Sequence, residues 1–223
     1  MTNHSKYKYP RTPHLPWSLA VQSDDVQKKA ADLGSWQDRW VIATEKMDGE
    51  NTNVYADGSI HARSLDSKDH PSRHWLKQWW SERAHDLPEG WRVCGENMYA
   101  RHSIAYAELP HYFMGFSIWD EKNLCLSWDE TIKWFKTMGI EPVRVLYDGV
   151  FDESKLRQLW SQADNNQMEG YVVRPKEAFL FEEFDQSVAK MVRKGHVQTD
   201  SHWMHQKLVP NGLRPKPVKG HKN

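Results

Sequence analysis

Short strand-like segments joined by tight turns are the feature that most constrains the fold of this chain. Residues 40–46 have the apolar composition of a strand, and segments 51–57 and 57–64 meet at Asp57-Gly58, a dipeptide typical of a hairpin turn. Later apolar runs also predict strands, over residues 91–99, 112–120, 168–175 and 187–192. No glycine-rich turn follows the first strand, so the pattern favours an α+β fold with mostly antiparallel sheets over a doubly wound parallel sheet.

Three segments between these strands have the pattern of amphipathic helices. The first covers residues 72–87, and the second begins with a capping box at Ser127 and is predicted to end at Gly139. The third is predicted over residues 152–165. We expect the twelve Trp side chains to pack in the core and against helices, rather than to form a platform for nucleobases.

The composition excludes several classes of protein. With 223 residues the chain has the length of one domain, and its 30 basic and 30 acidic residues leave no net charge to attract a polyanion. No run approaches 18 apolar residues, and residues 1–20 contain no apolar signal-peptide core, so we expect neither a membrane span nor secretion. Cys94 and Cys125 lack the spacing of a disulfide or metal motif, which favours a cytoplasmic location.

Charge is unevenly distributed along the chain. Residues 1–23 contain three basic residues and no acid, and residues 190–223 contain eight basic residues and one acid. Such ends are either solvated tails or basic arms that hold a phosphate backbone. We therefore divide the chain into a basic N-terminal arm (1–23), a central domain (24–209) and a basic C-terminal tail (210–223), and expect no packed structure after Val209.

Six short signatures lie near the ends of the predicted strands. In chain order they are Glu45-Lys46-Met47-Asp48-Gly49-Glu50-Asn51, Arg63-Ser64, Gly95-Glu96, Phe116, Glu169-Gly170-Tyr171-Val172-Val173-Arg174 and Lys190. Each alone is weak evidence, because a Lys-x-Asp-Gly sequence can be a simple turn and a strand Phe is ordinarily a core residue. Their order along one chain indicates a single site.

In this order the signatures resemble those of the covalent nucleotidyltransferase superfamily of polynucleotide ligases and capping enzymes, and most closely the nick-sealing RNA ligase family. The segment around Lys46 resembles motif I, in which the lysine becomes adenylylated. Gly95-Glu96 resembles motif III, the strand with Phe116 motif IIIa, and the segments at Glu169 and Lys190 motifs IV and V. The resemblance implies an adenylyltransferase fold of two antiparallel sheets with flanking helices, the nucleotide held between them.

The resemblance also implies a set of site residues. Lys46 and Lys190 would be catalytic, and Glu169 would bind the metal. Nucleotide contacts are assigned to Glu45, Lys46, Asp48, Gly49, Asn51, Arg63, Glu96, Phe116, Glu169, Lys190 and Arg193. Within this set, Glu45 would hold the adenine edge, Phe116 the adenine face, Glu96 the ribose and Arg63 a phosphate.

The implied reaction is chemically suited to these residue types. A lysine can carry AMP as a phosphoramidate, which divides one difficult step into two easier ones. Its ordinary pKa of about 10.4 leaves few neutral amines at pH 7, so a neighbouring cation must lower that pKa. Lys190 and a divalent ion, Mg²⁺ or Mn²⁺ held by Glu169, are expected to do so and to neutralise the α-phosphate of ATP.

Two departures from the family pattern affect these expectations. The second lysine common in motif V is replaced by Val192, and Arg193 or Lys194 is the candidate replacement. The 33 residues after Lys190 are too few for an OB domain, so we expect no OB domain in this chain. Substrate binding would then depend on the core surface, the basic ends or an accessory protein.

Three functional hypotheses follow. The favoured one is an ATP-dependent RNA ligase that joins 3′-OH and 5′-phosphate ends of a nicked duplex or paired RNA. The second is a DNA-joining or GTP-using member of the same superfamily, and the third a nucleic-acid end-binding protein with an idle nucleotide pocket. A structural zinc site at His196, His202 and His205 is disfavoured, because no Cys lies nearby.

Overall fold

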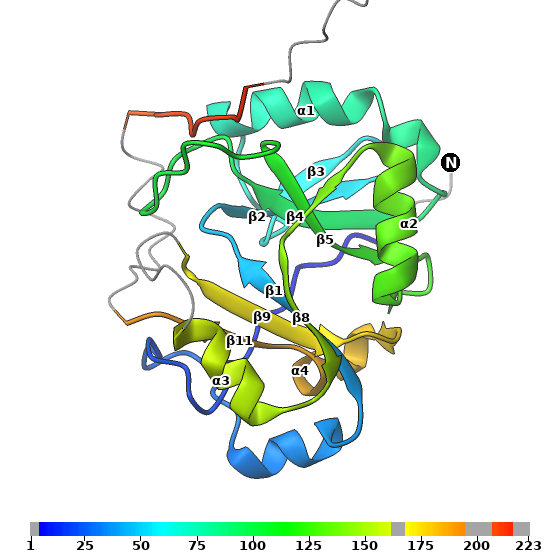
Figure 1. Ribbon diagram of the computed structural model, residues 1–223. Helices are drawn as coiled ribbons and strands as arrows, with labels where there is room; N and C mark the ends of the chain where they lie inside the picture. Colours follow the sequence, from blue (N-terminus) through cyan, green and yellow to red (C-terminus); the bar gives the residue numbers. More distant parts are fainter. Residues whose placement is uncertain (1–4, 162–167, 195–206, 216–223) are drawn as a thin grey trace, which may run out of the picture.

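Two β-sheets form the body of the protein, which is described by a computed structural model. In the view of Figure 1 one sheet lies above the other. The structure describes residues 5–161, 168–194 and 207–215. All strand pairs are antiparallel except that of β5 with β7. The predicted α+β fold of two antiparallel sheets with flanking helices is therefore confirmed.

The four-stranded sheet has the order β11-β9-β1-β8. Its strands are β1 (Trp40–Lys46), β8 (Val145–Val150), β9 (Gly170–Pro175) and β11 (Ala189–Val192). Apolar side chains on one face of this sheet, including Val41 and Tyr171, pack against Leu33, Trp36 and Leu156. Burial of these side chains holds helix α3 (Glu153–Ser161) and the 3₁₀ segment η1 (Ala30–Trp36) against the sheet.

The second sheet has the order β10-β6-β5-β4-β2-β3, with β7 paired to β5. Its strands are β2 (Glu50–Tyr55), β3 (Ile60–Ala62), β4 (Arg92–Asn97), β5 (Phe113–Trp119), β6 (Leu124–Cys125), β7 (Glu141–Pro142) and β10 (Phe179–Leu180). Helices α1 (His74–Ser81) and α2 (Trp128–Met138) cover it, and their buried residues Trp80 and Phe135 belong to one hydrophobic cluster with Phe113 of β5. A further cluster with Ile42 from β1 and Met114 from β5 joins the two sheets.

The helices are short; α1 and α2 lie on the outer side of the second sheet, and α3 lies on the outer side of the four-stranded sheet (Figure 1). They are α1 (His74–Ser81), α2 (Trp128–Met138), α3 (Glu153–Ser161) and α4 (Phe184–Ser187), with 3₁₀ segments η1 (Ala30–Trp36), η2 (Pro71–Arg73), η3 (Ala84–Asp86) and η4 (Phe181–Glu183). As predicted, Ser127 caps α2 by accepting a hydrogen bond from the backbone of Glu130, and Gly139 ends it in the left-handed conformation. No helix in the described ranges is long and apolar enough to cross a membrane.

The ends of the chain are more closely packed than their composition indicates. Leu15 is fully buried, its N–H donates to the carbonyl of Lys190 at 2.7 Å, and Lys190 N–H donates to the carbonyl of Pro13 at 2.8 Å. Residues 13–15 therefore extend the four-stranded sheet beyond β11. Contact between residues 1–23 and a phosphate backbone stays a prediction.

The expectation that nothing packs after Val209 is wrong for residues 210–214. Asn211 is only 5% exposed, because its side chain and backbone find hydrogen-bond partners in the loop between β4 and β5. Figure 1 shows this orange-to-red segment beside the green loop. The remainder of the predicted tail, residues 216–223, lies outside the described residues, as do His196, His202 and His205 of the disfavoured zinc site.

Candidate active site

A cleft of about 720 Å³ is lined by residues of both sheets. That volume lies within the range of small-molecule sites. Ten of the eleven predicted site residues line it, namely Glu45, Lys46, Asp48, Gly49, Asn51, Arg63, Glu96, Phe116, Glu169 and Lys190. Signatures separated by more than 140 positions in the sequence thus meet in one cavity.

Lys46 is placed by the end of strand β1. It pairs in register with Gly170 of β9, so Glu169 lies directly before the paired residue. A Cβ atom at position 170 would lie 1.9 Å from the backbone oxygen of Met191, and only glycine allows β9 and β11 to approach this closely. The Nζ of Lys46 consequently lies 2.6 Å from each carboxylate oxygen of Glu169.

The ionisation of Lys46 differs from the expectation. Burial lowers the pKa of Lys46, but the carboxylates of Glu169 and Glu96 outweigh that effect, and the net pKa lies above the ordinary lysine value. This direction is opposite to the depression predicted from Lys190 and a divalent ion, and Lys190 alone does not produce that depression. In this state Lys46 is a protonated amine held in an ion pair.

Two other ionisable groups in the cleft have strongly shifted pKa values. Burial, only partly offset by Lys46, raises the pKa of the Glu96 carboxyl to about 8. Burial and the nearby charge of Lys46 lower the pKa of Lys190 to about 8. The cleft therefore contains a carboxyl group and an amine that both titrate near neutral pH, which is typical of active sites.

Asp48 is fixed by a loop of the second sheet. Its Oδ2 accepts hydrogen bonds from the backbone of Ile104 at 2.6 Å and from the hydroxyl of Ser103 at 3.0 Å, and its N–H donates to Tyr106 Oη at 3.0 Å. Gly49 next to it leaves no space for a side chain, because a Cβ there would lie 2.5 Å from the sulfur of Met98. Motif I therefore runs from one sheet to the other in a constrained conformation.

The predicted adenine-binding residues lie at the cleft wall. The half-buried ring of Phe116 on β5 meets Tyr9 edge-on, with 5.6 Å between ring centroids. Glu45 forms an ion pair with Arg144, in which Nε lies 2.9 Å from Oε2, and burial raises the pKa of this carboxyl. Asn51 pairs in register with Glu96 across β2 and β4.

Arg193 is the predicted site residue that does not line the cleft. Side chains alternate along β11, so Lys190 and Val192 point to one side and Met191 to the other, and Arg193 follows the end of the strand. The backbone N–H of Arg193 donates to the carbonyl of Glu169 at 2.9 Å. The position of the second motif V lysine is thus occupied by buried Val192, and a nucleotide contact from Arg193 stays a prediction.

The donor atoms of the cleft fit a divalent cation that is shared with a nucleotide. Glu169 supplies carboxylate oxygens, which Mg²⁺ and Mn²⁺ prefer, and is 1% exposed. Among the described residues, no three His, Cys, Asp or Glu side chains lie close enough together to hold an ion by themselves. Glu169 is the predicted metal-binding residue, and its carboxylate is the one that could hold a cation together with oxygens of a nucleotide.

Two buried pairs in this region have no signal in the sequence. Arg73 donates from Nε to Glu50 Oε2 at 2.7 Å, and both residues line the cleft. His14, whose backbone bridges to Lys190, lies 3.1 Å from the carboxylate of Asp25, and burial lowers the pKa of His14 to about 4. Partners in both pairs come from different segments, so local patterns could not reveal them.

Solved structures share this fold. An archaeal ATP-dependent RNA ligase is 17% identical with a TM-score of 0.58, and the match covers 82% of this chain and 48% of that chain. A variant of the Naegleria gruberi RNA ligase solved with ATP and Mn is 15% identical with a TM-score of 0.55 (85% and 63%). A protein from Aquifex aeolicus assigned as an ATP-dependent DNA ligase is 18% identical with a TM-score of 0.54 (84% and 50%). The chain thus spans less than two thirds of each.

At these identities the structural likeness establishes the fold alone. No curated protein sequence gives a significant match. The RNA ligase family model, however, matches residues 39–192, more than half of the chain and the segment with the signatures from Glu45 to Lys190. The chain therefore belongs to the RNA ligase family.

Proposed function

We propose that this protein is an ATP-dependent RNA ligase that joins 3′-OH and 5′-phosphate ends through a lysyl-AMP intermediate on Lys46. The observation that carries the proposal is the position of Lys46 in the cleft, 2.6 Å from Glu169 and accompanied by Glu96 and Lys190. The family match and the ATP-bound Naegleria ligase of the same fold support ATP as the substrate.

In the first step, Lys46 Nζ attacks the α-phosphate of ATP. A phosphorus–nitrogen bond forms, the bond to the β-phosphate oxygen breaks, and pyrophosphate leaves. Lys46 must lose a proton, and the adjacent Glu169 carboxylate is the nearest acceptor. Lys190 faces the same cleft and, in its charged form, stabilises negative charge that develops on the phosphate. A divalent cation, when bound, supplies further positive charge beside the phosphates.

The later steps use the same residues. AMP passes from Lys46 to the 5′-phosphate of the nucleic acid, and the 3′-OH then attacks that phosphate and releases AMP. Glu96 holds the ribose hydroxyls of the nucleotide, and Phe116 packs on its base. Both groups bind AMP throughout, so they serve each step.

Incubation with α-labelled ATP and Mg²⁺ tests the nucleophile. The wild-type protein is expected to acquire acid-stable label, and Lys46→Ala to acquire none. Lys46→Arg should also fail, because a guanidinium does not lose its proton near neutral pH. Lys133→Ala, an exposed lysine on α2, is the matched control and should label normally. Labelling of either Lys46 variant would exclude Lys46 as the nucleophile.

The type of strand is tested with nicked duplexes of matched sequence. The proposal predicts sealing when the strands at the nick are RNA, with lower activity on DNA strands. Preferential sealing of DNA strands would favour the DNA-joining alternative over the proposal. Labelling of the protein from GTP and not from ATP would favour the GTP-using alternative. A folded protein that binds ends and never labels would be the idle-pocket alternative.

A further inference from the structure

We propose that Asn211 is a positioning residue for Asp48, acting through the loop between β4 and β5 and so fixing the part of motif I that follows Lys46. The inference rests on the proposed function only where adenylylation is the readout. It concerns residues 207–215, here called the C-terminal strap, which lie beyond the matched family segment 39–192.

The side chain of Asn211 is fully used by this loop, residues 98–112. Its Nδ2 donates to the carbonyls of Met98 at 2.8 Å and Ala100 at 3.4 Å, and its Oδ1 accepts from the backbone of Tyr106 at 3.1 Å. Both ends of the amide are thereby satisfied in a site where the residue is 5% exposed. These hydrogen bonds join the start of the loop, at Met98 and Ala100, to Tyr106, and so fix the two parts of the loop relative to one another.

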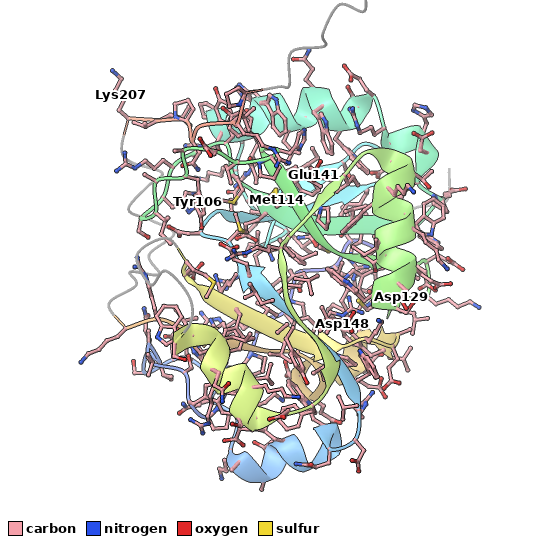
Figure 2. The ribbon with its side chains drawn as sticks, viewed as in Figure 1. Tyr106, Met114, Asp129, Glu141, Asp148 and Lys207 are labelled. Carbon is pink, nitrogen blue, oxygen red and sulfur yellow. The ribbon has the colours of Figure 1, made fainter. Side chains whose placement is uncertain are left out.

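The backbone of the strap adds further bonds to the same loop. Asn211 N–H donates to the carbonyl of Tyr99 at 3.0 Å, and Gly212 N–H to the carbonyl of Tyr106 at 2.8 Å. At Gly212 a Cβ would lie 2.3 Å from the carbonyl oxygen of Ala107, so the strap lies in direct backbone contact with the loop. Figure 2 shows Tyr106 within the molecule and Lys207 pointing outward on the same side.

The other side of the loop holds Asp48. Ser103 and Ile104 donate to its carboxylate, and the Tyr106 hydroxyl accepts from its backbone N–H. Tyr106 therefore contacts Asn211 through its backbone and Asp48 through its side chain. A short run of hydrogen bonds connects the strap to the residue two positions after the nucleophile.

Loss of the Asn211 amide would leave the carbonyl of Met98 and the N–H of Tyr106 without this partner in a buried site. Buried polar groups without a partner are costly, so the loop would shift to satisfy them. Because small displacements of positioned groups reduce rates strongly, we expect a slower chemical step with ATP binding almost unchanged.

Single-turnover adenylylation, measured over a range of ATP concentrations up to saturation, separates positioning from folding. Asn211→Ala should lower the rate constant roughly tenfold with the KM for ATP within about twofold, while the labelled fraction at the end point stays at the wild-type level. A merely structural role would lower the end-point fraction and leave the rate constant unchanged. Val209→Ala, a strap residue with an exposed side chain, is the matched control and should behave as wild type.

Tyr106→Phe provides a second variant, since it removes the hydroxyl that accepts from Asp48. If Asn211 acts through Tyr106, Asn211→Ala should cost less in the Tyr106→Phe background than in wild type. Fully additive effects, or an unchanged rate constant in Asn211→Ala, would overturn the proposal.

Hydrogen exchange tests the connection without using activity. Asn211→Ala should speed exchange in residues 98–112 and also in residues 46–51, and Val209→Ala in neither. Faster exchange confined to the loop would show that the loop does not hold Asp48, and would refute the inference. If wild-type protein never labels with ATP but exchange responds as expected, the proposed function fails and the positioning role stands.

Discussion

Lys46 must be charged to form its ion pair with Glu169 and neutral to attack a phosphate. The pair explains why its pKa lies above the ordinary value despite burial. An amine held in this way is positioned but not reactive until its proton leaves. The adjacent Glu169 carboxylate therefore has two effects. It orients Nζ of Lys46, and it reduces the fraction of Lys46 that is neutral.

Replacement of the two cleft carboxylates should give different defects. Glu169→Ala is expected to impair every metal-dependent step, because a cation site with few protein ligands rarely survives loss of a carboxylate. Glu96→Ala should weaken ATP binding instead, so that high ATP partly restores adenylylation. Initial rates across a range of ATP and Mg²⁺ concentrations measure both. Equal rescue of the two variants by ATP would contradict this division of roles.

The pH dependence of adenylylation should report Lys46 and Lys190. The second-order rate constant for labelling should rise with pH, because the pKa of Lys46 is raised and only its neutral form attacks. It should level off above about pH 8, because the loss of charge on Lys190 then offsets the growing neutral fraction of Lys46. Lys190→Arg keeps its charge at high pH, so the rate constant of this variant should continue to rise above pH 8 even if it is lower throughout. A plateau that is unchanged in this variant would exclude Lys190 as its cause.

At the scale of elements, the close approach of β9 and β11 places Glu169 and Lys190 on one cleft. Gly170→Ala would put a methyl group 1.9 Å from the carbonyl of Met191, and these strands would have to separate. We expect a loss of about 1–3 kcal/mol in stability and slower adenylylation. Gly34→Ala, where a Cβ meets nothing within 4 Å, is the control. Equal melting temperatures of the two variants would show that the strands tolerate the methyl group.

Local patterns predicted the elements with strong signals. The hairpin at Asp57-Gly58 and the capped helix α2 follow from turn and cap chemistry, which acts over a few residues. The predicted helix 72–87 instead divides into η2, α1 and η3, with α1 ending at Ser81. Strand β8 was not predicted, since it is an edge strand with no fully buried residue and a weak apolar alternation.

On the scale of the whole molecule, the N-terminal segment and the C-terminal strap both act on the cleft from outside the family segment. The first extends the sheet beside Lys190, and the second holds the loop that fixes Asp48. Removal of residues 210–223 would therefore disturb the site as well as any phosphate contact. A deletion that tests the basic tail must therefore leave the C-terminal strap, residues 207–215, in place.

Deletion of residues 216–223 meets that requirement and removes Lys216, Lys219 and Lys222. If all three contact phosphates, the slope of log affinity against log salt should flatten by roughly two to three units, at about 0.7–0.9 per contact. Self-adenylylation should hardly change. Binding of full-length and shortened protein to one nicked RNA duplex, measured across salt concentrations, decides the outcome. Identical slopes would show that these lysines do not contact the backbone.

The sequence by itself determined the fold class, the family and ten residues of the cleft, because strand alternation, turn chemistry and short motifs are local properties. The tertiary structure alone decided the ionisation of Lys46, since that depends on Glu169 and Glu96 brought beside it from distant strands. It also decided that Arg193 lies outside the cleft and that Asn211 is buried against the loop of Asp48. Such contacts join residues far apart in the chain, and their energies depend on burial, which no local pattern contains.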